Sequence, residues 1–112
     1  MHLFLATDSK RKAENIWFVG ATKSTAEKIK EDLPIDKKSG SVDFVVKTPQ
    51  AKEILSLFQE NVGHENIDKN TLLVQGDHGR LAQLLIQITR DYEIDHPSIR
   101  RSMVRWFKNV NS

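Results

Sequence analysis

The chain has 112 residues, of which 38% are hydrophobic and 29% charged, and this composition predicts one globular domain over residues 1–112. It contains no cysteine, which excludes disulfides, thiolate metal sites and cysteine nucleophiles. The formal net charge is only +2, so only a local cluster of charges would indicate a polyanion partner. No apolar run is long enough to cross a bilayer, and the short apolar start lacks the basic flank of a secretory signal. We therefore expect a cytoplasmic protein with no membrane role.

The first quarter of the chain predicts a hairpin followed by a helix. Residues 3–6 and 15–20 are rich in β-forming side chains and fit two antiparallel strands, with the polar segment 8–12 as the turn. Ser24 and Glu27 have the spacing of a capping box, in which the hydroxyl and the carboxylate satisfy two backbone amides. We therefore expect Ser24 to begin the first helix.

The middle of the chain predicts two more strands around a second helix. Residues 41–47 alternate apolar and polar side chains, as a half-buried strand does. Thr48 and Pro49 then suit the cap and first turn of a helix that ends near Gly63. Residues 64–70 are polar and fit a loop, and residues 71–75 fit a fourth strand.

The last third predicts two helices with a short break. Residues 79–91 carry apolar side chains at helical spacing, and Asp77 is the expected cap. After the break at 92–96, Pro97 suits the first turn of a second helix, and Asp95 is a candidate cap. The resulting order, ββαβαβαα, predicts an α+β fold: a small mixed sheet of about four strands covered by helices, with a C-terminal helix pair. The predicted core comprises Phe44, Val46, Ile54, Leu55, Phe58, Leu84, Leu85, Ile88 and Met103.

The final helix, residues 97–108, separates apolar from basic side chains. From Ser98 onward the chain has four basic and no acidic residues, whereas the part before Ser98 has 13 basic and 15 acidic residues. This asymmetry makes the helix a candidate binding surface. On a helical wheel at about 100° per residue, one side carries Ile99, Met103, Trp106, Phe107 and Val110, and the other carries Arg100, Arg101, Arg105 and Lys108.

The helix pair also matches a known pattern over about sixteen residues. The matching positions are Ile88, Thr89, Tyr92, Ile94, Pro97, Ser98, Ile99, Arg100, Ser102 and Met103. In this pattern the segment 88–103 resembles the helix-turn-helix of GntR-type transcription regulators. At the position of that family's turn glycine, where φ > 0 is often required, this chain has Glu93. The resemblance implies a recognition helix over residues 97–108, with His96, Ser98, Arg100 and Arg101 facing bases or phosphates.

These observations predict a small regulatory module that binds a macromolecule and is not an enzyme. One hypothesis is DNA binding, and hence transcription regulation, through the C-terminal helix pair. The alternative is a protein-interaction adaptor or inhibitor of bacterial or mobile-element origin, without a nucleic-acid role. In either case the expected contact residues include His96, Ser98, Arg100, Arg101, Arg105 and Lys108, with Trp17, Trp106 and Phe107 added for a protein partner. The sequence leaves a homodimer open.

Other chemistry has weaker support in the sequence. His64, His78 and His96 each lie beside an acidic residue, but they lack the spacing of a zinc pair, so we expect no metal and no cofactor. The turn from Gly20 to Ser24 suits an anion or small ligand, but it lacks the second glycine of a phosphate-binding loop. No arrangement of a nucleophile with a base predicts catalytic residues.

Overall fold

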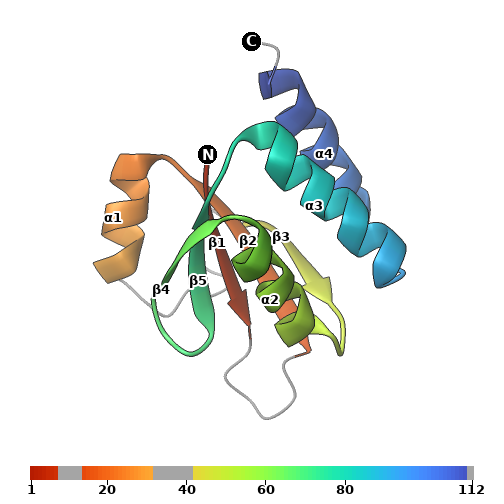
Figure 1. The fold of residues 1–112 in the computed structure, drawn as a ribbon, viewed down its shortest axis with the longest axis horizontal. Coiled ribbons are helices and arrows are strands. Elements are labelled where there is room, and N and C mark those ends of the chain that lie inside the picture. The colour runs from red at the N-terminus through yellow and green to blue at the C-terminus, as the bar shows by residue number, and fades with distance from the viewer. Residues whose placement is uncertain (8–13, 32–41, 111–112) are drawn as a thin grey trace. The chain divides into compact units, whose positions relative to one another are not determined.

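The structure is a computed structural model that describes residues 1–7, 14–31 and 42–110 (Figure 1). It divides into two compact units, Met1–Gln75 and Gly76–Ser112. The single domain predicted over residues 1–112 stays a prediction. The elements in chain order are β1 (His2–Thr7), β2 (Asn15–Ala21), α1 (Lys23–Glu31), β3 (Val42–Lys47), α2 (Ala51–Asn61), β4 (Gly63–Asn66), β5 (Thr71–Gln75), α3 (His78–Asp91) and α4 (Pro97–Val110).

The first unit is built on a five-stranded sheet in the order β3-β2-β1-β5-β4 (Figure 1). All four strand pairings among the described residues are antiparallel, and the α+β class is confirmed. The sequence predicts about four strands, and the additional strand is β4. It lies where the sequence predicts a loop, and that prediction is wrong for residues 64–66. All four residues of β4 are exposed, so no alternation of apolar side chains marks it. It exists because its backbone hydrogen-bonds to the edge of β5.

The register of the sheet places α1 and α2 on opposite faces. Leu5, Phe18 and Phe44 lie side by side across three strands, so their side chains share one face. On that face the Phe58 ring of α2 meets Phe18 edge-on, with ring centroids 6.0 Å apart. The other face carries the buried cluster that includes Ala26 of α1, together with Phe4, Val19 and Leu73. The central strands are therefore buried on both sides, which explains why β1 reads as a nearly continuous apolar run.

The start of α1 differs from the sequence prediction. The Thr22 hydroxyl oxygen accepts a hydrogen bond from the backbone N–H of Thr25 at 3.2 Å, so Thr22 is the cap and not Ser24. Ser24 lies inside the first turn, where its hydroxyl is 3.2 Å from that of Thr22. Both residues are chemically suited to capping, and the backbone turn after β2 decides which of them is used. The described part of α1 ends at Glu31.

The start of α2 differs too, and it is later than predicted. The helix begins at Ala51, and Gln50 occupies the cap position without a side-chain hydrogen bond. Thr48 accepts instead from the backbone N–H of Gln50 at 3.2 Å, which closes a turn before the helix. Thr48 is therefore a turn residue of the β3–α2 connection. The predicted hairpin turn at residues 8–12 lies outside the described residues.

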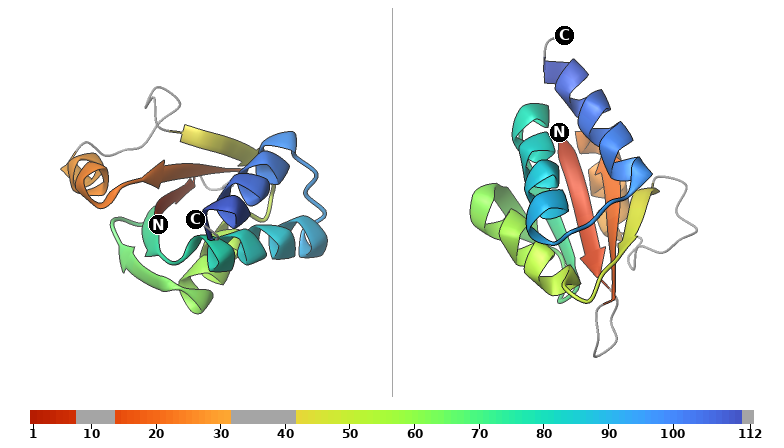
Figure 2. Two further views of the ribbon diagram at one scale, coloured as in Figure 1. Left: turned by 90° about the horizontal axis from the view of Figure 1, so that it is seen from above. Right: turned by 90° about the vertical axis from the view of Figure 1, so that its right-hand side faces the viewer.

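The second unit is a helical hairpin of α3 and α4, which pack against each other. The two further views show α4 returning alongside α3 (Figure 2). The predicted cap of α3 is confirmed: Asp77 Oδ1 accepts from the backbone N–H of Arg80 at 2.8 Å. Between the helices Glu93 has φ 53°, the left-handed conformation that glycine adopts without strain. The turn between the helices therefore holds a glutamate in a conformation that a residue with a side chain rarely adopts.

The predicted core is largely confirmed. Seven of its nine members are buried, and the two exceptions, Leu55 and Met103, are half-buried on the edges of α2 and α4. Both lie one position away from a buried stripe, where sequence periodicity defines the boundary least well. Trp17 and Trp106 are almost fully buried, at 8% and 1% exposure, so neither is available for a partner. The prediction of these two tryptophans as contact residues is therefore wrong.

Candidate functional site

The exposed side of α4 is the candidate site. The helix buries Ile99, Ser102 and Trp106 on one side. The opposite side is exposed and, like the rest of α4, has no acidic residue. We call this side the basic face of α4, and it consists of Arg100, Arg101, Val104, Arg105 and Lys108.

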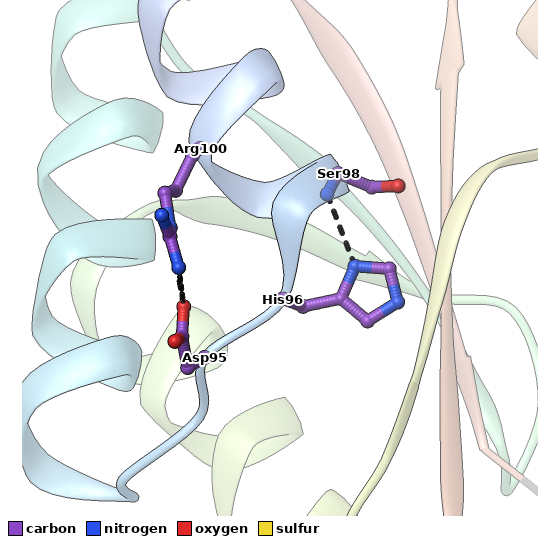
Figure 3. A network of polar contacts seen from close by, with 4 residues as sticks. All are labelled: Asp95, His96, Ser98 and Arg100. Atoms are coloured by element: carbon purple, nitrogen blue, oxygen red, sulfur yellow. Dashed lines mark hydrogen bonds and ion pairs between the residues drawn. The ribbon is translucent and has the colours of Figure 1, made fainter.

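His96 holds the start of α4. Its ring Nδ1 accepts a hydrogen bond from the backbone N–H of Ser98 at 3.1 Å (Figure 3). Its carbonyl oxygen accepts from the backbone N–H of Ile99 at 3.0 Å. His96, and not the predicted Asp95, is therefore the cap of the helix. An acceptor role requires an unprotonated Nδ1, so the ring carries its proton on Nε2 when it is neutral. The predicted contact residues His96 and Ser98 are thus joined by a structural hydrogen bond at the start of the helix.

Asp95 pairs with Arg100 instead. The guanidinium of Arg100 donates from Nε to Asp95 Oδ1 at 3.1 Å and makes a second contact through its terminal nitrogen (Figure 3). Both side chains are mostly exposed, at 64% and 77%, so the pair is screened by water and adds little stability. The next cation, Arg101, donates to the hydroxyl oxygen of Ser98 at 3.0 Å. The first turn of α4 therefore positions two guanidinium groups without burying either of them.

Val104 is the residue of this face that the sequence analysis did not single out. It is 56% exposed, and together with the four cations it lines a shallow open hollow of about 530 Å³. A helical wheel places position 104 between Arg100 and Lys108, so the sequence carried this signal. Phe107, which the helical wheel places with the apolar side chains of the helix, is 38% exposed. The side chain of Val110 lies outside the described residues.

A second, polar hollow of about 330 Å³ lies in the first unit beside α1 and β4. Lys30 crosses it, with Nζ 2.8 Å from Glu65 Oε2 and 3.5 Å from Glu27 Oε1. The hydrogen bond to Glu65, more than the charge of Glu27, raises the pKa of Lys30. Lys23, at the start of α1, also lines this hollow, next to the turn that the sequence marked as a weak anion site. The internal ion pairs tie α1 to β4 and account for most of the charge here.

Two further classes of site find no support in the described residues. Within residues 1–7, 14–31 and 42–110, no three His, Asp or Glu side chains come together in a way that could hold a metal ion. In the same ranges, no helix combines the length and the apolar character needed to pass through a bilayer.

Compared with known protein families, curated proteins and solved structures, the chain matches none. The local resemblance of residues 88–103 to a helix-turn-helix therefore stays a prediction.

Proposed function

We propose that the protein is a small regulatory module that binds DNA through the basic face of α4. The observation that carries the proposal is the exposure of four cationic side chains on one face of a helix that has no acidic residue. Cations clustered on one helix face attract phosphates, and the release of counterions from the DNA makes such binding favourable. The positive φ of Glu93 adds support, because it gives the turn the backbone conformation of the family's glycine.

The proposed binding mode uses the outer face of α4. A helix with side chains is about 10–12 Å across, and the major groove of B-DNA is about 12 Å wide. The 14 residues of α4 are long enough to occupy the groove while the cations contact phosphates beside it. The inner side of the helix, with Trp106, stays buried in the protein.

Fluorescence anisotropy with a labelled mixed-sequence duplex at several salt concentrations tests the proposal. We expect the logarithm of affinity to fall linearly with the logarithm of salt concentration, by about 0.9 for each phosphate neutralised. The double substitution Arg100→Ala and Arg101→Ala should weaken binding and flatten this slope by up to about 2. The matched control, Lys52→Ala with Lys69→Ala, removes two exposed cations from the first unit and should change little. Absence of binding at low salt, or an equal loss in the control, would contradict the proposal.

The second candidate is a protein partner, favoured by the exposure of Phe107 beside the basic face. Aromatic and arginine side chains together are typical of the residues that dominate protein interfaces. A protein complex that withstands salt high enough to abolish DNA binding, and that Phe107→Ser weakens, would favour this candidate. The physical reason is that salt screens charge pairs but does not weaken apolar burial.

A further inference from the structure

The basic face of α4 has an apolar centre. Val104 is the exposed apolar residue among its four cations, and the side chains of all five residues line one shallow hollow. A helix face that only needed to stay solvated would have no requirement for valine at this position. The apolar centre therefore limits what kind of surface can be complementary to this face.

The cations lie on both sides of Val104. With about 100° between successive residues, Arg100 is displaced by about 40° to one side, and Arg101 and Arg105 by about 60° and 100° to the other. Lys108 follows one turn later, about 6 Å along the helix axis. A partner that fits this face must present negative charge along two edges and an apolar group between them.

The major groove of DNA presents this combination. Phosphates line both of its edges, and the C5-methyl group of thymine is an apolar group exposed on its floor. We propose that α4 lies in the major groove and that Val104 contacts thymine methyl groups while Arg100 and Arg105 reach the phosphates of opposite strands. This inference rests on the proposed DNA binding. It adds which feature of the DNA base sequence the protein would recognise, namely the thymine methyl group.

The structure also shows which groups oppose this contact. Asp95 is an acidic residue in direct contact with the basic face, and it holds Arg100 through the exposed ion pair. A phosphate can replace this carboxylate without disturbing the helix start, because His96 and not Asp95 makes the cap. Arg101 donates to a neutral hydroxyl, that of Ser98, which competes with a phosphate less strongly than a carboxylate does.

The test compares two duplexes of the same sequence, one containing thymine and the other deoxyuracil, which lacks only the methyl group. Burying one methyl group contributes about 0.8 kcal/mol, which corresponds to about 4-fold in affinity. We therefore expect the wild-type protein to bind the thymine duplex about 4-fold more tightly for each methyl group contacted. Val104→Ser should bind both duplexes with similar affinity and keep the salt dependence of the wild type. Ile86→Ser, which changes an exposed apolar residue of α3, is the matched control and should keep the preference for thymine.

The outcomes separate the two proposals. Equal, salt-dependent binding of both duplexes by the wild type would overturn the role of Val104 and leave DNA binding by α4 intact. A thymine preference that survives in Val104→Ser would also overturn that role. No binding of either duplex at low salt would overturn both proposals, and the basic face would then be better explained by a protein partner.

Discussion

Arg100 and Asp95 form an ion pair at the start of α4, in which the carboxylate precedes the helix and the guanidinium projects from its first turn (Figure 3). The pair places a negative charge against the surface that we propose to bind phosphates. It therefore acts as an internal competitor for one of the four cations.

Asp95→Asn should increase affinity for DNA, because Arg100 then reaches a phosphate without first losing an ionic partner. We expect an exposed pair of this kind to contribute at most about 1 kcal/mol to folding, so stability should change little. Anisotropy titrations and urea unfolding measure the two quantities separately. Asp91→Asn is the matched control, because Asp91 pairs with Arg90 of α3, outside the basic face. Weaker binding by Asp95→Asn would show that the carboxylate positions Arg100 for its partner.

Glu93→Gly should stabilise the protein. A left-handed conformation costs a residue with a side chain about 1–2 kcal/mol, and glycine removes this cost. The gain is offset by about 0.5–1 kcal/mol, because glycine loses more chain entropy on folding. A net increase of up to about 1 kcal/mol in the free energy of unfolding is therefore expected in urea titrations. Glu60→Gly, within α2, should instead lose about 1 kcal/mol. Destabilisation by both substitutions would mean that the turn does not hold Glu93 at positive φ in solution.

Thr22→Ala should cost about 0.5–2 kcal/mol, because the backbone N–H of Thr25 loses the hydroxyl that accepts its hydrogen bond. Ser24→Ala should be close to neutral, since Ser24 lies within the helix and alanine favours helix formation. Urea unfolding of the two variants side by side decides between the two caps. The reverse order of effects would place the helix start at Ser24.

Phe58→Ala should cost about 3–5 kcal/mol and Leu84→Ala about 2–5 kcal/mol, because both side chains are fully buried and their truncation leaves cavities. The two residues belong to different compact units. A single domain over residues 1–112 predicts that each substitution lowers one shared unfolding transition. Two transitions, each moved by only one of the substitutions, would contradict the single-domain prediction. A melting temperature within a degree or two of wild type for either variant would contradict the predicted packing.

Lys30 should stabilise the fold in a pH-dependent way. Its hydrogen bond to Glu65 raises its pKa above the ordinary value of 10.5, so the charged form is favoured in the folded state. The resulting stabilisation is fully present below pH 10.5 and is lost as the pH rises through the folded-state pKa. Unfolding free energies of wild type and Lys30→Gln should therefore differ at neutral pH and converge in strong alkali. Lys28→Gln, exposed on the same helix, should show no such convergence.

The sequence by itself determined the elements whose side chains carry a periodic pattern. It located α3 and α4, the cap Asp77, seven buried residues of the core and the cationic side of α4, because apolar spacing and charge asymmetry are local properties of the chain. The residue type at position 93, glutamate, gave no local sign of the positive φ that Glu93 adopts.

Only the tertiary structure decided the features that depend on distant partners. β4 became a strand because the edge of β5 offers backbone hydrogen bonds, although its own exposed side chains give no sign of it. Thr22 and His96 are the caps because the turns before α1 and α4 direct their acceptor atoms toward backbone amides of the first helical turn. Ser24 and Asp95 also have acceptor side chains, but the backbone does not place them at the cap positions. The contact of Asp95 with Arg100 and the shallow hollow around Val104 likewise depend on side-chain positions in space. Residue spacing along the chain fixes which side chains share a face, but folding fixes which groups come within bonding distance.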